Sequence, residues 1–231
     1  MNLAIVGYGK MGHLIEELAS DYGCEVKLRL DMENNANFEG LTKENFRGID
    51  AAIEFSTPSA APENIERVAQ LGVNAVVGTT GWFGEMDRAR KAVERAGTGL
   101  VWSPNFSVGV SIFSQVVAET ARRMSHQPEY GAWAWEIHHA TKKDAPSGTL
   151  LSLVQTMKQN GYDRPIDMCA SRAGAHPGTH EIGFDSSADT ITVRHTARSR
   201  EGFARGALRA ARWVVGKKGF FDFRQIVSEL A

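Results

Sequence analysis

The amino-acid sequence predicts an α/β protein, in which a doubly wound parallel sheet is joined to a second, smaller α+β domain with a mixed or antiparallel sheet and helices. Up to about residue 106, short apolar runs alternate with longer amphipathic ones, which is the pattern of β-α-β units. Beyond that point strand-like runs follow one another more closely. With 231 residues, the chain has enough apolar material for two such domains.

In the first part, short runs rich in Val, Ile, Leu and Ala predict buried strands at residues 3–6, 25–30, 51–55, 74–77 and 100–102. Helices are expected between them at residues 10–22, around 65–69 and at 83–96. The first helix places Leu14, Ile15 and Leu18 on one face, as a helix packed on a sheet requires.

The second part begins with a predicted helix that contains Val110, Ile112, Phe113, Val116 and Val117. Strands are expected at residues 133–137, 167–170, 180–184 and 190–197. Between the first two of these strands, a helix is expected to place four apolar residues on one face: Leu150, Leu151, Val154 and Met157.

The last stretch, residues 203–231, is predicted to be helical and carries a wide apolar surface formed by Phe203, Ala207, Leu208, Ala211, Trp213 and Val214. We expect this surface to pack on the N-terminal sheet. The predicted domains are therefore a dinucleotide-binding domain at 1–107, completed by 203–231, and a substrate-binding and oligomerisation domain at 108–202.

Composition excludes several classes of protein. The chain has 42% hydrophobic and 23% charged residues and a net charge of -1, which argues against disorder and gives no bulk electrostatic reason to bind nucleic acid or an anionic membrane. Cys24 and Cys169 stand far apart, outside any disulfide or zinc pattern. No run of about 18 apolar residues and no export signal is visible. We expect a cytoplasmic protein.

A glycine motif follows the first predicted strand. Gly7-Tyr8-Gly9-Lys10-Met11-Gly12 has the pattern G-x-G-x-x-G and opens the first helix, where helix N-terminal amides point at a pyrophosphate. Asp31 ends the second strand, nineteen residues beyond Gly12, where a carboxylate accepts hydrogen bonds from an adenosine ribose. The alternative is a glycine turn with a surface aspartate. Strand, turn, helix and acid in register favour a Rossmann-type dinucleotide site.

Asp31 also bears on the choice of cofactor. A carboxylate at this position repels a 2′-phosphate, so NADH is favoured over NADPH unless a nearby cation, Lys10 or Arg29, compensates. Use of both cofactors stays open on this reasoning.

Two more loops follow predicted strands at the edge of the sheet where ligands gather. The first is Gly78-Thr79-Thr80-Gly81 and the second is Ser103-Pro104-Asn105-Phe106. We expect Thr80 and Phe106 to contact the nicotinamide, although turn chemistry alone also explains such loops.

The densest chemical signal lies at residues 136–149, in the string Glu-Ile-His-His-Ala-Thr-Lys-Lys-Asp-Ala-Pro-Ser-Gly-Thr. His138, His139 and Lys142 precede the Ser147-Gly148-Thr149 start of a helix, so cations and helix N-terminal amides converge on one loop and suit a carboxylate ligand. Singly, Ser147 or Thr149 could merely cap the helix and Lys142 could be solvated. His176, His180 and His195 stand isolated and lack the spacing of metal ligands.

The whole chain resembles the 4-hydroxy-tetrahydrodipicolinate reductase (dihydrodipicolinate reductase) family in its short bacterial form. The resemblance rests on the Gly7–Gly12 turn, on residues 78–81 and 104–109, on the His-His-x-x-Lys-x-Asp-x-Pro-Ser-Gly-Thr string, and on residues 172–180 and 203–207. It implies NAD(P)H-dependent reduction in the diaminopimelate route of lysine biosynthesis and a homotetramer formed through the second domain. Tyr8 and Lys10 depart from many relatives, which weakens any transfer of their NADPH preference.

The resemblance also implies roles for residues. His138 would donate a proton, Lys142 would hold or polarise the small dicarboxylate substrate, and His139, Gly148 and Thr149 would contact its carboxylates. The dinucleotide would be lined by the first glycine turn, Gly78, Thr79 and Thr80, and the Ser103–Phe106 loop. We expect hydride transfer from the nicotinamide C4 to C4 of a cyclic, doubly carboxylated imine-type substrate that forms after loss of its 4-hydroxyl group, and no metal.

Two rival functions share some of these features. Another dinucleotide-dependent dehydrogenase, such as one that acts on aspartate, would share the first domain but has no evident use for the string at 136–149. A non-catalytic NADH sensor should carry a recognition helix or basic patch, and the sequence shows neither.

Overall fold

The computed structural model describes residues 1–230 and divides the chain into two compact units. Unit 1 comprises Met1–Val108 and the chain from Glu201 onward, and unit 2 comprises Gly109–Arg200. The predicted borders at 107/108 and 202/203 differ from these by one or two residues. Residue 231, the last of the predicted helical segment, lies outside the described residues.

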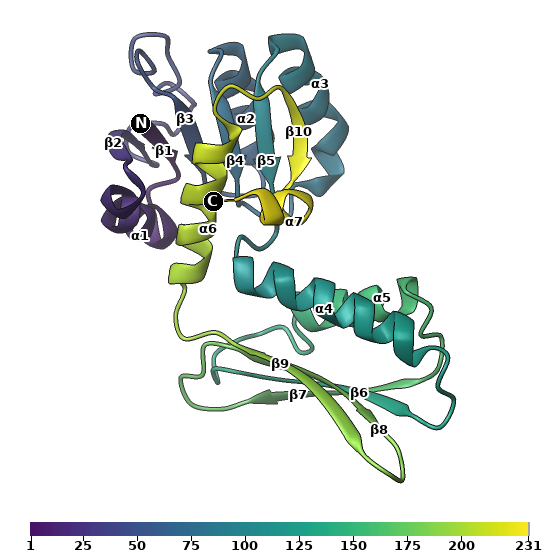
Figure 1. Ribbon diagram of the computed structural model, residues 1–231. Coiled ribbons are helices and arrows are strands. Elements are labelled where there is room, and N and C mark those ends of the chain that lie inside the picture. Colours follow the sequence, from purple (N-terminus) through teal and green to yellow (C-terminus); the bar gives the residue numbers. More distant parts are fainter. Residues whose placement is uncertain (231) are drawn as a thin grey trace. The chain divides into compact units, whose positions relative to one another are not determined.

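Unit 1 is built on a six-stranded parallel sheet in the order β10-β5-β4-β3-β1-β2 (Figure 1). The order reverses at β1, since β2 lies on one side of it and β3 on the other. In parallel sheets of this kind, ligands bind at the carboxyl ends of the strands where the order reverses. The strands are β1 (Asn2–Val6), β2 (Glu25–Leu30), β3 (Ala51–Glu54), β4 (Asn74–Val77), β5 (Gly99–Trp102) and β10 (Gly219–Asp222).

Helices cover both faces of this sheet, and each face has its own hydrophobic core. One core joins β-strand residues such as Ile5 and Ile53 to α1 and α6, and the other joins Val6 and Val77 to α2 and α3. The doubly wound architecture is thus confirmed. The helices are α1 (Lys10–Ala19), α2 (Ala61–Gln70), α3 (Met86–Ala96), α6 (Glu201–Val214) and α7 (Phe223–Ile226), with 3₁₀ turns at Ser20–Tyr22, Phe83–Glu85 and Val227–Glu229.

The C-terminal segment corrects one prediction. Residues 203–231 were expected to be helical, but β10 lies between α6 and α7 and adds a sixth strand beside β5. Four residues, Gly-Phe-Phe-Asp, are too few to show the alternation of a strand, and Phe221 packs against Trp213 of the preceding helix at 5.0 Å between ring centroids. The predicted packing of α6 on the sheet is confirmed, because Leu208 and Val214 are fully buried in the unit 1 core.

Unit 2 has a four-stranded mixed sheet in the order β7-β6-β8-β9, with β6 parallel to β7 and antiparallel to β8. Two helices cover one face of it, and side chains from both meet β6 and β8 in a single core. The second α+β domain of the prediction is thus confirmed. The elements are α4 (Val108–Met124), β6 (Gly131–His138), α5 (Gly148–Gln159), β7 (Ile166–Arg172), β8 (Thr179–Asp185) and β9 (Thr190–Thr196).

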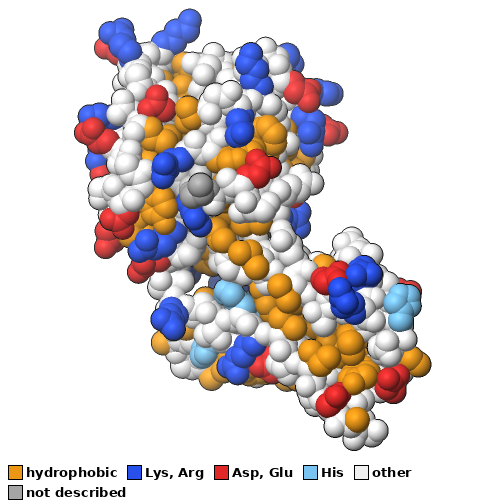
Figure 2. Space-filling model, in the orientation of Figure 1, with side chains coloured by type: hydrophobic (Ala, Val, Ile, Leu, Met, Phe, Trp, Pro, Cys, Tyr) orange, Lys and Arg blue, Asp and Glu red, His pale blue; other side chains and the backbone are white. Residues whose placement is uncertain are grey.

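The apolar residues of α4 and α5 do not all face this core. Phe113 and Val117 are buried, but Ile112 and Val116 of α4 and Leu151 of α5 are exposed. The prediction that Leu151 shares a face with Leu150, Val154 and Met157 is therefore wrong, because the stripe that packs on the sheet is narrower than the apolar pattern. Figure 2 shows hydrophobic side chains gathered over α4. In the described part of the chain, no helix has the length and apolar character needed to cross a membrane.

Two glycines of α6 provide a test of packing in unit 1. A Cβ at Gly206 would lie 1.7 Å from the carbonyl oxygen of Phe106, whereas a Cβ at Gly202 would meet Ser107 Oγ at an ordinary 3.5 Å. We expect Gly206→Ala to lower the free energy of unfolding by about 1–3 kcal/mol, since it overpacks the contact with backbone. Gly202→Ala should be neutral or stabilising, because alanine favours a helix by up to about 1 kcal/mol. Urea unfolding of both variants measures this, and equal effects would contradict the packing argument.

Candidate active site

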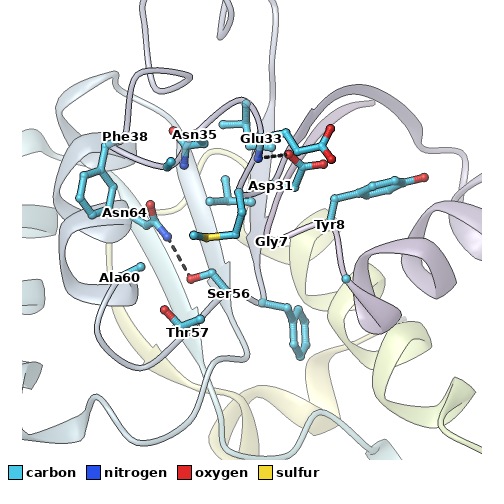
Figure 3. Close-up of a pocket in the computed structure, with 16 residues that line it drawn as sticks. Gly7, Tyr8, Asp31, Glu33, Asn35, Phe38, Ser56, Thr57, Ala60 and Asn64 are labelled. Atoms are coloured by element: carbon cyan, nitrogen blue, oxygen red, sulfur yellow. Dashed lines mark hydrogen bonds between the residues drawn. The ribbon is translucent and has the colours of Figure 1, made fainter.

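A cavity of about 430 Å³ opens at the carboxyl ends of β1, β2 and β3, where the strand order reverses (Figure 3). Gly7, Tyr8 and Gly9 form part of its wall, and Asp31 lies next to them at the end of β2. Residues after β3, among them Ser56 and Thr57, close the opposite side. The cavity thus lies where the sheet topology predicts a ligand.

The three motif glycines have three different roles. A Cβ at Gly7, where φ is +98°, would lie 2.3 Å from the carbonyl oxygen of Phe55, so this glycine allows the turn to lie against the backbone that follows β3. A Cβ at Gly12 would lie 2.8 Å from Gly7 O and 3.1 Å from Ile5 Cγ2, so this glycine lets α1 pack against β1. At Gly9 a Cβ would meet nothing within 4 Å. The backbone at Gly9 is therefore open to a ligand.

The start of α1 fits a pyrophosphate. Gly9 is the N-cap and supplies no side-chain hydrogen bond, and the first turn holds no acidic residue. Within the described chain, no hydrogen bond engages the backbone N–H groups of Lys10 and Met11. These amides and the helix dipole attract an anion. The anionic part of a dinucleotide is its pyrophosphate, and the open space at Gly9 leaves room for it.

One carboxylate oxygen of Asp31 is bound by the backbone of the turn that follows β2, and the other remains for a ligand. Oδ1 accepts hydrogen bonds from the N–H groups of Glu33 (2.8 Å) and Asn34 (3.3 Å). For Oδ2, no hydrogen bond is present among residues 1–230. The carboxylate is thus fixed by the turn and lines the cavity, as a ribose-binding acid should.

The cations considered in the sequence lie outside the wall of this cavity. Arg29 donates from Nε to Glu16 Oε1 at 2.8 Å, and Tyr8 donates from its hydroxyl to the same carboxylate. Lys10 lines a second cavity instead. The described wall of the first cavity contains Asp31 and Glu33 and no lysine or arginine.

The second cavity, of about 320 Å³, continues from Gly9, Phe55 and Ser56 toward the β4 end. It brings together Lys10 and Met11 with the loop residues Gly78, Thr79 and Thr80. A Cβ at Gly78 would lie 2.1 Å from Phe55 Cζ, so this position needs glycine for the aromatic ring to fit. The two cavities share Gly9 between them, as an extended ligand that crosses the sheet end would require.

The Ser103–Phe106 loop lines neither of these cavities. Ser103 Oγ accepts a hydrogen bond from Asn105 N–H at 3.1 Å, and Asn105 Oδ1 accepts one from Ser107 N–H at 2.9 Å. The Phe106 ring is buried in the unit 1 core against Phe223, with ring centroids 4.8 Å apart. Phe106 therefore serves packing, and only its backbone remains for a nicotinamide contact.

Glu54, at the end of β3, is a buried acid that the sequence did not single out. Its Oε1 accepts hydrogen bonds from Ser56 N–H (3.1 Å) and Asn64 Nδ2 (3.3 Å). Burial raises the pKa of Glu54 above its ordinary value. Because Ser56 and Asn64 line the first cavity, this acid fixes part of its wall.

Unit 2 holds a second polar cluster at the end of β6. Strand alternation places Glu136 and His138 on the same buried face, and the sheet register sets Glu136 opposite His180 and His138 opposite Arg172. Glu136 is fully buried. Its carboxylate lies at the centre of the cluster.

Each oxygen of Glu136 has partners. Oε1 accepts hydrogen bonds from Ser147 N–H (2.8 Å) and Arg172 Nη2 (2.7 Å). Oε2 accepts one from the Ser147 hydroxyl and lies 3.3 Å from His180 Nε2 and 3.7 Å from His138 Nδ1. Burial by itself raises the pKa of Glu136, but the hydrogen bonds from Ser147 and Arg172 outweigh it, so the pKa lies below its ordinary value. Glu136 is a carboxylate at neutral pH.

His138 is the only histidine of the predicted site that is buried within the described chain. Burial lowers its pKa, the charge of Glu136 opposes this, and Lys142 and Arg172 add to the lowering. His138 Nδ1 has no hydrogen-bond partner among the described residues. On the other side of the ring, a Cβ at Gly178 would lie 2.9 Å from Nε2. His138 is thus a neutral base at neutral pH, placed between a carboxylate and a bare backbone.

The loop after β6 supplies the remaining predicted residues. Lys142 Nζ pairs with Asp144 at 2.7 Å, and His139 Nδ1 lies 2.8 Å from Thr141 Oγ1. Ser147 caps α5 by accepting a hydrogen bond from Leu150 N–H at 3.2 Å, so the capping role considered for it is confirmed. For the N–H groups of Gly148 and Thr149, no partner exists in the described chain. A Cβ at Gly148 would meet nothing within 4 Å, so these amides are accessible to an anion.

Sequence reasoning missed the contacts of His180. It was expected to stand isolated, but its ring centroid lies 5.0 Å from that of His138, and it shares Glu136 with it. The reason is the antiparallel pairing of β6 with β8, which joins residues 44 positions apart. His195 lies opposite His180 on β9.

Glu136, His138 and His180 also present ligand atoms within 4.8 Å of one another, which is the spacing of a metal site. The charges oppose this use, because Arg172 already pairs with the carboxylate at 2.7 Å and Ser147 donates to both of its oxygens. The donor set therefore fits an imidazole acid/base better than a cation.

A parallel sheet with a glycine turn of this geometry at its switch point is typical of dinucleotide-dependent oxidoreductases, and the unit 2 cluster adds groups that can move a proton. Comparison with known proteins narrows this class. Residues 1–106 match the family model described as dihydrodipicolinate reductase, N-terminus, and residues 109–227 match dihydrodipicolinate reductase, C-terminus. The chain belongs to the dihydrodipicolinate reductase family.

Relatives in sequence span the whole chain. A 4-hydroxy-tetrahydrodipicolinate reductase of Christiangramia forsetii is 36% identical over 100% of this chain and 99% of its own length. Another, of Archaeoglobus fulgidus, is 35% identical over 96% of this chain and 97% of its own.

Solved structures share the fold. A dipicolinate-bound dihydrodipicolinate reductase from Paenisporosarcina sp. TG-14 matches with a TM-score of 0.81 at 21% identity, covering 98% of this chain and 99% of that one. Aspartate dehydrogenase from Thermotoga maritima matches with a TM-score of 0.52 at 12% identity, covering 94% and 97%.

The His180 environment predicts an acid-sensitive stability. Burial, and then the neighbouring charge of His138, lower the pKa of His180 from 6.5 to about 4. Between these values the unfolded chain binds a proton that the folded chain does not, so stability that is present above pH 6.5 is lost as the pH falls toward 4. The loss amounts to at most about 3 kcal/mol.

Urea unfolding at a series of pH values measures this effect. We expect His180→Gln to reduce the pH dependence in that window, while part of it remains because burial also lowers the pKa values of His138 and His195. His126→Gln, which changes an exposed histidine of the same unit, should leave it unchanged. A slope in His180→Gln as steep as that of the unmodified protein would contradict the assignment.

Proposed function

We propose that this protein catalyses the NAD(P)H-dependent reduction of 4-hydroxy-tetrahydrodipicolinate to tetrahydrodipicolinate in the diaminopimelate route of lysine biosynthesis. The observation that carries the proposal is the match of both halves of the chain to one reductase family, with relatives of that name 35–36% identical over 96–100% of the chain. The cluster at the end of β6 supports it, since it combines an imidazole, a lysine and accessible amides.

We assign the proton to His138. Reduction of the conjugated ring leaves negative charge that a proton must neutralise, and an imidazole is a side chain that can take up a proton and give it away again. Nε2 of His138 faces the backbone of Gly178 rather than a side chain. When bound, a reduced nicotinamide dinucleotide supplies the hydride to C4 of the conjugated cyclic imine that remains after the substrate has lost its 4-hydroxyl group as water.

Lys142 and the start of α5 bind the two carboxylates in this proposal. Lys142 supplies a fixed positive charge, which its contact with Asp144 orients. The N–H groups of Gly148 and Thr149, the Thr149 hydroxyl and His139 supply hydrogen-bond donors. Orientation and electrostatics thus come from unit 2.

Unit 1 binds the dinucleotide in this proposal. Gly7, Tyr8, Gly9 and Asp31 would hold the adenosine half, and Lys10, Met11, Gly78, Thr79 and Thr80 the nicotinamide half, with Gly12 serving the packing of α1. The Ser103–Phe106 loop would contribute backbone groups alone. Unit 2 is then the substrate-binding and oligomerisation domain.

NADH is the favoured cofactor. The wall of the first cavity presents Asp31 and Glu33, and Arg29 is held by Glu16, so the positive charge that a 2′-phosphate needs is missing from that described wall. No step of the proposed reaction calls for a metal.

The proposed assembly is a homotetramer through unit 2, located in the cytoplasm. Exposed apolar side chains on its strands, Met168 of β7 and Ile191 of β9, support a surface that a second copy covers. Cys24 and Cys169 are both free thiols, in keeping with a reducing compartment.

The test is consumption of NADH by the purified protein with freshly generated substrate, followed by absorbance. His138→Gln should lower kcat about 100-fold or more, because it removes the acid, with little change in the KM for substrate. Lys142→Ala should lower kcat and also weaken substrate binding, because the charge acts on both. Both variants should bind NADH as the unmodified protein does.

Lys143→Ala is the matched control, since this exposed lysine is adjacent to Lys142. Equal loss of NADH binding in His138→Gln and Lys142→Ala would contradict the assignment. NADH consumption with aspartate-derived imine, and none with the dicarboxylate, would favour an aspartate dehydrogenase instead.

Asp31→Asn tests the choice of cofactor. The amide oxygen can still accept the hydrogen bonds from Glu33 and Asn34, while the charge is lost. A charged hydrogen bond contributes about 1.5–3 kcal/mol, so we expect the ratio of kcat/KM for NADH to that for NADPH to fall about tenfold or more. Glu33→Gln is the control, because it removes one negative charge from the same cavity wall without changing Asp31. An unchanged NADH-to-NADPH ratio of kcat/KM in Asp31→Asn would exclude the contact between Asp31 and the ribose.

A further inference from the structure

A fully buried carboxylate lies directly behind the proposed acid. Glu136 and His138 are two residues apart on β6 and share its buried face, with 3.7 Å between Oε2 and Nδ1. Four other groups lie around the carboxylate and come from three places in the chain: the N–H and the hydroxyl of Ser147 at the start of α5, Arg172 of β7 and His180 of β8. His138 Nδ1 has no hydrogen-bond partner in the described chain, and neither has Nε of Arg172.

We propose that Glu136 is a positioning residue for the reduction: its buried carboxylate makes His138 take up one proton when a dicarboxylate binds, so that the acid is loaded only on the liganded enzyme. This inference rests on the proposed function. It assigns to Glu136 a role in proton supply that does not require contact with the substrate.

The charges around His138 favour its neutral form in the free protein. Lys142 and Asp144 face it from the loop after β6, Arg172 from β7 and His180 from β8, with His195 of β9 behind His180. Lys142 pairs with Asp144 and Arg172 with Glu136. The charges of two positive and two negative groups therefore nearly cancel at His138, and burial favours the uncharged form of the imidazole.

A bound dicarboxylate changes this balance by two negative charges. These two charges favour a positive imidazole at His138. Its Nδ1–H can then donate a hydrogen bond to Glu136 Oε2. The two atoms are 3.7 Å apart, so they must approach by less than 1 Å to form this bond. The same hydrogen bond directs Nε2–H away from the carboxylate. His180, with its ring centroid 5.0 Å away, stays neutral because two adjacent imidazolium ions repel each other.

The proton balance of the reaction is then complete. One proton passes from solvent to His138 as the dicarboxylate binds, and it leaves from Nε2 to the ring carbon that receives it after reduction. His138 returns to the neutral form and Glu136 is a carboxylate throughout. The 4-hydroxyl group leaves as water, together with a hydrogen of the neighbouring ring carbon, before the hydride is added, and this elimination consumes no net proton. Each turnover therefore consumes one hydride and one proton and releases one water, and product release leaves the site ready for the next ligand.

Proton uptake can be measured without turnover. We would titrate the NADH-loaded protein with dipicolinate, a planar dicarboxylate, by calorimetry at pH 7.5 in buffers of different ionisation enthalpy. The slope of heat against buffer enthalpy gives the protons taken up. We expect about one proton per site for the unmodified protein.

Three variants separate charge from shape. Glu136→Gln keeps the volume and loses the charge, and uptake should fall to less than about a fifth of the unmodified value. Glu136→Asp keeps the charge on a shorter arm and should restore part of it. Glu181→Gln is the matched control, since Glu181 lies on β8 next to His180 but faces the other side of the sheet, and it should leave uptake unchanged.

The pH profile provides the second readout. Activity needs protonated His138, so kcat/KM falls as the pH rises through its pKa. Removal of a negative charge within about 4 Å lowers that pKa by about one unit or more, and in Glu136→Gln the fall should move to lower pH by that amount. We expect kcat to fall about 10- to 100-fold, with the KM for NADH unchanged. If the role of Glu136 were only structural, the pH at which kcat/KM falls would be the same in Glu136→Gln as in the unmodified protein.

The outcomes distinguish the two proposals. Dipicolinate binding to the unmodified protein without proton uptake overturns the role of Glu136 and leaves the proposed function standing. Uptake retained in Glu136→Gln overturns it as well. Failure of the unmodified protein to bind dipicolinate or reduce the substrate overturns the proposed function, and the inference falls with it. These two measurements on the unmodified protein need no variant to fold.

Discussion

The burial of one carboxylate organises unit 2. Glu136 is fully buried on β6, and such a charge is tolerated only where donors surround it. Those donors come from the start of α5, from β7 and from β8, so the helix start, the two neighbouring strands and the loop that carries Lys142 are all fixed relative to one carboxylate. The same constraint accounts for the polar residues Ser147 and Arg172 near the end of β6, since both donate hydrogen bonds to Glu136.

Unit 1 depends on close backbone contacts instead of charge. The glycine turn lies so close to the backbone after β3 that a side chain at Gly7 has no room, and α1 approaches β1 only because Gly12 has no side chain. Both contacts serve packing, and they bring the N–H groups at the start of α1 to the cavity. The two units thus reach function in different ways, one by exposing backbone and the other by burying a side chain.

Much of this architecture is legible in the sequence. Strand runs of Val, Ile and Ala and a glycine motif between strand and helix are local patterns, and they predicted the parallel sheet and the turn at residues 7–12 correctly. β10 was missed because four residues show no alternation.

The neighbours of His138 were missed for a different reason. The pairing of Glu136 with His180 depends on the register between β6 and β8, and that register is set by the folded sheet rather than by any local pattern. Phe106 shows the converse, since an aromatic residue in the loop after β5 was expected to contact a ligand and its ring is instead part of the core.

Gly178 has a consequence for how the imidazole is reached. Its φ of +142° and the 2.9 Å from a hypothetical Cβ to His138 Nε2 mean that the ring borders main chain there, with no side chain between. A side chain at 178 would overlap the outer nitrogen of the ring, and the left-handed backbone would strain it as well. The place that the imidazole occupies is thus kept free by a residue without a side chain, in the segment that connects β7 to β8.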